Sequence, residues 1–434
     1  MKRKIIVGVL VLVLAVLATV GLAACDDGDN GAGGNSGSTP PNYTPPEYTQ
    51  NETLTFELND DSNGYVVTGL AEGVTDANII IPAIYNSLPV TAIGEQAFAA
   101  CRNLTSVTIS QNVSVIGSSA FQNCTSLRSL RFNTTSGLRE IGANALQNCT
   151  SLATVTIPDS VVSVGDRAFQ GCTALKTVTI GNGVQTVGVE AFRGCSKLSN
   201  VTIGNGLKQL GQNAFLNCGM IEKMSLPNSL ESIGLGALEG CTGLKELSIP
   251  FVGAQKYINP INDEQESIEK NTHFGYVFGI ESFKDQSSLR LDVLQTVTIT
   301  GGSPIGYHAF DGIGRFTDAQ GTKAIGLSTI VITGNVRFIS TGAFQGCQNL
   351  HTLVLPKSIA VIGGQILGNT LIERVYYCGS VADWANVDAG GASNNHHLFG
   401  NQYLVDPRCY YSETEPTTSG NYWHYVDGVP TMWE

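Results

Sequence analysis

Apolar residues recur at short, regular intervals along most of the chain. In one representative stretch, Leu175, Val178 and Ile180 follow the pattern L-x-x-V-x-I, and the β-branched residues alternate with polar ones. This alternation predicts a short strand with one buried face. The Gly-Asn-Gly triplet at 181–183 then predicts a turn. The residues 184–187 predict a second, shorter extended piece.

A third segment completes this unit. Gly188 changes the direction of the chain, and Ala191, Phe192 and Cys195 follow at positions i, i+1 and i+4, which predicts one helical turn with its apolar side inward. A single unit has only half a core, so it must stack on its neighbours to bury these residues. The pattern therefore predicts a mostly β repeat solenoid of short parallel strands and short helical turns.

The same unit returns in a fixed frame. The seven cysteines from Cys101 to Cys241 are separated by 23, 25, 23, 23, 23 and 23 residues. Less regular copies continue towards the C-terminus, with insertions near 250–293 and 314–326, and give about eleven units over residues 93–378.

Aromatic and cysteine side chains at equivalent positions are expected to form the core ladder. These residues are Phe98, Cys101, Phe121, Cys124, Cys149, Phe169, Cys172, Phe192, Cys195, Phe215, Cys218, Cys241, Phe310, Phe344 and Cys347. Disulfides between stacked cysteines are the alternative, but an odd ladder cannot pair completely, and we expect buried thiols. No Cys-x-x-Cys occurs, and one stripe of cysteines cannot surround a metal ion. The pairing of Cys378 with Cys409 stays open.

The complete unit, I-G-x-x-A-F-x-x-C-x-x-L-x-x-V-x-I-P, resembles the BspA-type (Treponema-type) leucine-rich repeats of bacterial surface proteins. Residues 65–69, 79–82 and 88–91 are similar to the segment that precedes the repeats in this family. Residues 375–377 and Trp384 are similar to the unit that closes its repeats. The resemblance implies a right-handed leucine-rich-repeat superhelix. It also implies a cell-surface protein that binds other macromolecules, often in adhesion, without catalytic chemistry. Family members bind very different partners.

The N-terminus has the pattern of an export signal. Three basic residues at 2–4 precede an uncharged apolar run over 5–20, and the sequence Leu-Ala-Ala-Cys ends at Cys25. This ending resembles a bacterial lipobox, which implies a signal peptide over 1–24, lipid attachment at Cys25 and exposure on the cell surface. An uncleaved membrane anchor or ordinary secretion is the alternative. The Gly/Ser/Pro-rich residues 25–50 are typical of a solvated linker.

Both ends of a solenoid need a cap. Residues 51–92 contain a hairpin signal at Asn63-Gly64 and predict an N-terminal β cap. Residues 379–434 contain all three tryptophans and a second hairpin signal at Asp427-Gly428, which predicts an aromatic C-terminal cap. An aromatic platform for glycans is the alternative for this segment.

Charge and motifs exclude several functions. The chain of 434 residues has a formal net charge of −12, which argues against nucleic-acid binding. It has no phosphate-binding loop and no Gly-x-Ser-x-Gly or His-Glu-x-x-His motif. A calcium-like start at 59–64 lacks the final carboxylate, because Leu70 stands there. We therefore expect a monomer that is not an enzyme and has no cofactor or metal. A catalytic site within 250–293 or the tail is the disfavoured alternative.

The middle residue of each V-x-I strand is expected to point away from the core. The expected binding face consists of Thr108, Arg131, Thr156, Thr179, Thr202, Ser225, Ser248 and Thr298, and the row continues through Val331, Val354 and Tyr376. This mostly hydroxyl-bearing face suits an extracellular protein or glycan partner, and the insertions are expected to border it. We expect the protein to contact the membrane only through the lipid on Cys25. Two alternatives stay open: threonine is merely a good exposed strand former, or the protein has a structural role in the envelope.

Overall fold

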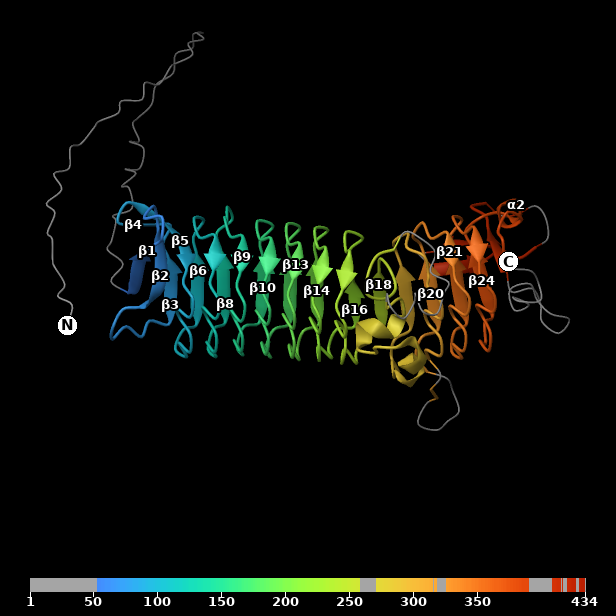
Figure 1. Ribbon diagram of the computed structural model, residues 1–434, viewed down its shortest axis with the longest axis horizontal. Coiled ribbons are helices and arrows are strands. Elements are labelled where there is room, and N and C mark those ends of the chain that lie inside the picture. The colour runs from blue at the N-terminus through green and yellow to red at the C-terminus, as the bar shows by residue number, and fades with distance from the viewer. Residues whose placement is uncertain are drawn as a thin grey trace, which may run out of the picture. The chain divides into compact units, whose positions relative to one another are not determined.

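A computed structural model describes residues 53–257, 271–314, 316–317, 325–389, 408–414, 416, 420–426 and 429–433. These residues belong to one compact unit, Gln50–Glu434, in which the repeats lie side by side in a row (Figure 1). Most repeats contribute one strand of about four residues, one strand of two residues and a run of turns. The chain is thus a repeat solenoid of many short parallel strands.

The longer strands form what we call the outer sheet. Most successive strands pair in parallel and in register, so that Val155 lies beside Val178 and Val178 beside Val201. The strands in the repeats and before them are β3 (Asn78–Ile81), β6 (Ser106–Ile109), β8 (Ser129–Phe132), β10 (Thr154–Ile157), β12 (Thr177–Ile180), β14 (Asn200–Ile203), β16 (Lys223–Ser225), β18 (Glu246–Ile249), β19 (Thr296–Ile299), β20 (Thr329–Ile332), β22 (Thr352–Leu355) and β24 (Arg374–Tyr377).

The two-residue strands form a second sheet that begins at the N-terminal hairpin. β1 (Leu54–Leu58) pairs antiparallel with β2 (Tyr65–Leu70), and β2 pairs in parallel with β5 (Leu88–Ile93). The short β4 (Ile84–Tyr85) pairs antiparallel with β5 beside this path. The sheet continues without a break to β17. Its remaining strands are β7 (Val115–Ile116), β9 (Glu140–Ile141), β11 (Ser163–Val164), β13 (Thr186–Val187), β15 (Gln209–Leu210) and β17 (Ser232–Ile233). β21 (Phe338–Ile339) and β23 (Val361–Ile362) form a separate pair further along.

The prediction of a helical turn in each repeat is wrong, because this segment is a series of β-turns. Three turns span 188–195, and each is closed by a backbone hydrogen bond over three residues. Glu190 and Gly194 have φ angles of 56° and 72°, a left-handed conformation that an α-helix does not contain. The alternating geometry points every second N–H at the next repeat, and the N–H of Phe192 donates to the carbonyl of Ala214 at 2.8 Å.

This geometry explains a pattern that the sequence analysis did not use. The residue before each ladder cysteine has a positive φ, and it is asparagine or glycine in almost every repeat. Glycine has no Cβ to clash there, and asparagine tolerates the left-handed region better than other residues. The residues are Ala100, Asn123, Asn148, Gly171, Gly194, Asn217, Gly240 and Gly346.

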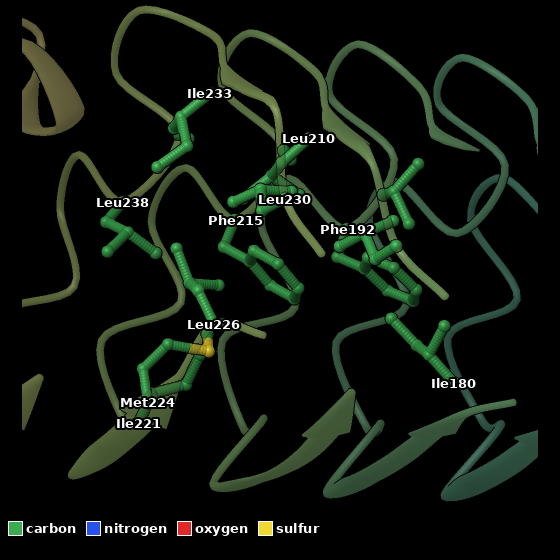
Figure 2. Close-up of a cluster of buried hydrophobic side chains, with 14 of the residues drawn as sticks. Ile180, Phe192, Leu210, Phe215, Ile221, Met224, Leu226, Leu230, Ile233 and Leu238 are labelled. Carbon is green, nitrogen blue, oxygen red and sulfur yellow. The ribbon is translucent and has the colours of Figure 1, made fainter. Parts of the chain in front are cut away.

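The core lies between the two sheets and the turns. All the phenylalanines of the expected ladder are fully buried, and the cysteines are buried except for Cys101, which is half-buried. The rings of Phe192 and Phe215 stack with centroids 5.2 Å apart and an interplanar angle of 6°. Figure 2 shows these two rings in a row, with Leu238 in the next repeat.

The long insertion contributes to this core. Its described part contains two short 3-10 helices, η1 (Phe274–Phe278) and η2 (Phe283–Ser288), while β18 and β19 pair directly in the outer sheet. Phe274 stacks on Phe310 with ring centroids 4.7 Å apart. The buried Gln286 holds this segment in place, since its amide nitrogen donates to the carbonyl of His308 at 2.7 Å. The described part of the insertion thus supplies an additional aromatic layer, and no strand comes between β18 and β19 in the outer sheet.

The C-terminal segment extends the outer sheet. A short helix, α2 (Val381–Trp384), follows β24, and β25 (Arg408–Tyr411) then pairs in parallel with β24. β26 (Tyr422–Val426) pairs with β25 and forms an antiparallel hairpin with β27 (Val429–Met432). Trp384 packs edge-on against Tyr377, with ring centroids 5.0 Å apart. These aromatic residues close the end of the core.

Candidate binding surface

The outer face is the side of the outer sheet that points away from the main core. Its central row consists of the eight residues of the expected binding face. Within each paired part of the sheet, neighbours in the row lie in register, as Thr156, Thr179 and Thr202 do. Arg131, Thr156, Thr202 and Ser225 are exposed, whereas Thr108, Thr179, Ser248 and Thr298 are half-buried. The structure thus brings these side chains together on one surface.

The row begins earlier than the sequence analysis placed it. Ile80 of β3 lies beside Thr108 in the parallel ladder, on the same face. Its side chain is 65% exposed, the largest value among the exposed large apolar residues of the described chain. An exposed isoleucine at the N-terminal end therefore adjoins the hydroxyl-bearing row.

At the C-terminal end, two members of the expected outward row are buried, which corrects that part of the prediction. Val354 and Tyr376 form a second hydrophobic cluster with Cys409 and Trp423, separate from the main core. The ring centroids of Tyr376 and Trp423 lie 5.1 Å apart. Val331, Cys378, Tyr411 and Met432 are partly buried against this cluster. The accessible hydroxyl row therefore ends near Thr298.

The outer sheet is interrupted at two places. The parallel strand pairing stops between β8 and β10 and again between β14 and β16, so the outer sheet consists of three parts. The second sheet remains paired across both places: Ile141 lies beside Val164 on one side of the first interruption and beside Ile116 on the other. We call the two interruptions the first seam (β8/β10) and the second seam (β14/β16).

The first seam coincides with the one irregular spacing between Cys101 and Cys241. Cys124 and Cys149 are separated by 25 residues instead of 23. The additional residues enlarge the loop after β8, where the side chain of Asn133 accepts a hydrogen bond from the N–H of Thr135 at 3.1 Å. A groove of about 690 Å³ lies at this seam. It is lined by Arg128, Ser129, Leu130, Arg131, Phe132, Asn133, Thr134, Ser136, Thr154, Thr156, Pro158, Asp159 and Ser160.

The second seam has a smaller groove and paired charges. A groove of about 460 Å³ is lined by Glu222 and Lys223 together with residues of β14. Lys223 forms an ion pair of 2.8 Å with Glu246. Glu222 forms one of 3.0 Å with Lys245. Both pairs join neighbouring repeats on the outer sheet, so the charges at this seam are compensated.

Most thiols of the core ladder are buried. Burial raises the pKa of Cys124 and of Cys172 to about 12, so both stay protonated at neutral pH. The cysteines from Cys101 to Cys241 form no disulfide with one another. Among the described residues, no group of three or more His, Cys, Asp or Glu side chains is placed to hold a metal ion.

Several sequence predictions lie outside the described residues. They include Cys25, the signal peptide over 1–24, the linker over 25–50 and much of the insertion near 314–326. Within the described ranges, no helix combines the length and the apolar character needed to cross a membrane.

Comparisons with known proteins agree with this architecture. The sequence matches the family described as "BspA type Leucine rich repeat region" in six copies, over residues 91–188, 163–262 and 322–386. No curated protein matches the chain.

Solved structures of bacterial leucine-rich repeat proteins are similar. The T. pallidum leucine-rich repeat protein is 30% identical and matches 46% of this chain and 91% of its own, with a TM-score of 0.42. A leucine-rich cell surface protein from Faecalibacterium prausnitzii A2-165 is 24% identical. The match covers 79% of this chain and 98% of the other, with a TM-score of 0.43. A leucine-rich repeat protein from Bacteroides ovatus is 22% identical. The match covers 83% of this chain and 93% of the other, with a TM-score of 0.40.

Proposed function

Because the chain belongs to the BspA-type leucine-rich repeat family, we propose that it is a non-catalytic surface protein that binds an extracellular protein or glycan, as in adhesion. The observation that carries this proposal is the registered row of Thr156, Thr179 and Thr202 on the outer face. The core does not use these hydroxyl groups, and they repeat at the spacing of the strands. Such a surface offers a partner many weak polar contacts along an extended line.

The location follows from the N-terminal pattern. We propose that the protein is exported, cut before Cys25 and held by lipid on that residue, with 26–50 as a tether. Mass spectrometry of the mature protein tests this: a lipid-modified N-terminal peptide that begins at Cys25 is the expected result. Recovery of an intact segment from Met1 to Ala24 overturns it.

The binding function is tested by screening the full-length protein against extracellular proteins and glycans. Replacing Thr156, Thr179 and Thr202 together by lysine is expected to abolish binding of any partner found, because three long charged side chains then stand across the row. The matched control replaces Thr173, Ser196 and Thr242 by lysine. These exposed residues each follow a ladder cysteine and lie off the outer sheet.

The two variants distinguish binding at the outer face from binding elsewhere on the protein. Loss of the partner in the first variant alone supports the outer face as the binding site. Equal binding by both folded variants moves the site to the caps, and no partner at all favours a structural role in the envelope.

A further inference from the structure

The first seam combines an open groove with positive charge in an acidic protein. Arg128 and Arg131 both line the groove and are exposed. Neither arginine forms an ion pair with any described residue, whereas the lysines at the second seam are paired with glutamates. The formal net charge of the whole chain is −12, so two uncompensated arginines three residues apart form a local exception.

The one carboxylate of the groove, that of Asp159, forms no ion pair with these arginines. Asp159 accepts a hydrogen bond from the backbone N–H of Asn182 at 2.6 Å, and its carboxylate oxygen also lies 3.5 Å from the amide nitrogen of that residue. Asp159 is therefore engaged with the following repeat. The guanidinium groups of Arg128 and Arg131 remain available to an external anion.

The geometry of the seam excludes an added peptide strand. Behind the groove, the N–H groups of Phe121 and Asn123 donate to the carbonyls of Ala145 and Gln147 at 2.7 and 2.8 Å, so the repeats stay one strand apart. Cα atoms of β8 and β10 still approach within 8 Å. An intervening strand requires about 9.6 Å, twice the usual strand separation. A ligand therefore lies over the seam and does not enter the sheet.

The lining chemistry is that of a polar ligand. Ser129, Thr134, Ser136, Thr154 and Thr156 line the same groove as the arginines and carry hydroxyl groups. The volume of about 690 Å³ lies within the range of about 300–1,000 Å³ that is typical of small-ligand sites. Hydroxyl groups form hydrogen bonds with sugar hydroxyls, and arginine binds carboxylates in a planar, bidentate manner.

We propose that the first seam binds a carboxylate-bearing glycan, with Arg128 and Arg131 on the carboxylates and the hydroxyl groups on the sugar ring. This inference rests on the proposed function, because it names a ligand class for one part of the outer face. The lining favours a glycan over an acidic peptide, since a peptide cannot extend the sheet here and most of the lining residues are polar or charged.

The test uses the full-length protein in mild detergent and tetragalacturonic acid as the probe. Its methyl-esterified form is the neutral control, and tetraglutamate is the peptide control. Calorimetry is expected to show binding of the acid that weakens as salt rises. The double variant Arg128→Gln/Arg131→Gln is expected to lose at least tenfold in affinity. Lysine at both positions is expected to give an intermediate value, because lysine keeps the charge without the bidentate geometry.

Lys176 provides the matched control. It occupies the same position in its repeat as Arg128, four residues after the ladder cysteine, but it lies where β12 pairs with both neighbours. Lys176→Gln is expected to bind tetragalacturonate like the unchanged protein.

Three results overturn the inference: no binding of the acid, equal binding by the double glutamine variant, or preference for tetraglutamate. The proposed function is judged separately. A partner that is lost in the threonine-to-lysine variant but retained in the arginine variant leaves the outer face as a binding surface and removes only the glycan site.

Discussion

The thiol of Cys195 donates a hydrogen bond to the carbonyl oxygen of Phe169, 26 residues earlier, at 3.3 Å. The same carbonyl accepts the N–H of Cys172 within its own repeat, so the thiol adds a bond to the neighbouring repeat. Equivalent thiol bonds of 3.0–3.4 Å are formed by Cys124, Cys149, Cys172, Cys218, Cys241 and Cys347. The cysteine position therefore favours a small apolar side chain that also carries a weak donor.

The first prediction compares the two ladders. Phe192→Ala is expected to destabilise the protein by about 3–5 kcal/mol, because the ring is fully buried between Phe169 and Phe215. Cys195→Ala is expected to cost about 1 kcal/mol, since it removes one sulfur and one weak hydrogen bond from a carbonyl that keeps another donor. Equilibrium urea unfolding measures both. A larger loss for the cysteine than for the phenylalanine contradicts this assignment.

The second prediction concerns acid stability. Glu190 lies between Arg167 and Arg193, with a nitrogen–oxygen distance of 2.6 Å to each. The hydrogen bond from Arg167, with that from Arg193, lowers the pKa of Glu190 from its ordinary value. The unfolded chain then binds a proton at higher pH than the folded one. This contribution is complete above the unfolded pKa, and it disappears as pH falls through the lower folded pKa.

Glu190→Gln is therefore expected to reduce stability at pH 7, with the difference from the unchanged protein shrinking as pH falls below about 4.3, the ordinary pKa of glutamate. Thermal unfolding across pH 2–7 measures the difference. Glu231→Gln is the control, because its exposed carboxylate lies 3.9 Å from the exposed Lys208 and contributes little. A pH-independent difference for Glu190→Gln refutes the electrostatic explanation.

The third prediction concerns the left-handed position before each cysteine. Gly194 has a φ of 72°, and a Cβ added there meets no other atom within 4 Å. Gly194→Asn is expected to be nearly neutral, because Asn217 adopts a φ of 62° at the same position of the next repeat. Gly194→Val is expected to cost about 1–2 kcal/mol for the conformation alone. Urea unfolding of both variants measures the cost, and equal stability of the two argues against a conformational role for glycine.

The fourth prediction concerns the second hydrophobic cluster. Trp423 is fully buried, and its indole nitrogen donates to the carbonyl of Tyr377 at 3.1 Å. Trp423→Ala is expected to destabilise by about 3–5 kcal/mol and to expose Val354 and Tyr376 on the outer face. Trp433→Ala is the control and is expected to cost less, since Trp433 is half-buried. Differential scanning calorimetry compares them, and an equal cost means that the cluster adds nothing specific.

The repeat frame was predictable because the same buried positions return with each unit. The spacing of the cysteines identified the core ladder, and the alternation around Val178 identified its strand and the outward direction of Thr179. The turns were not predictable from apolar spacing, because Ala191, Phe192 and Cys195 face inward in a helical turn and in linked β-turns alike. The positive φ of Glu190 distinguishes the two, and glutamate carries no signal for it.

The C-terminal end of the outer face, the long insertion and the seams were harder to predict from the sequence. Val354 and Tyr376 alternate like other outward residues, and only the aromatic neighbours on β25 and β26 bury them. Their apolar character was an available signal. Phe274 belongs to the ladder, but a long insertion separates it from the repeat frame. The first seam left a trace in the sequence, the spacing of 25 residues between Cys124 and Cys149, although no local pattern indicates that a sheet opens there.

The two seams also determine how the array responds to mechanical load. Bending that opens the outer face breaks no backbone ladder between β8 and β10 or between β14 and β16, because none exists there. Bending in the opposite direction strains the second sheet, which is continuous from β1 to β17. The compliance of the N-terminal half is therefore one-sided and concentrated at two hinges. We therefore expect a pulling force to distort the groove that contains Arg128 and Arg131 before it disrupts the stacked core.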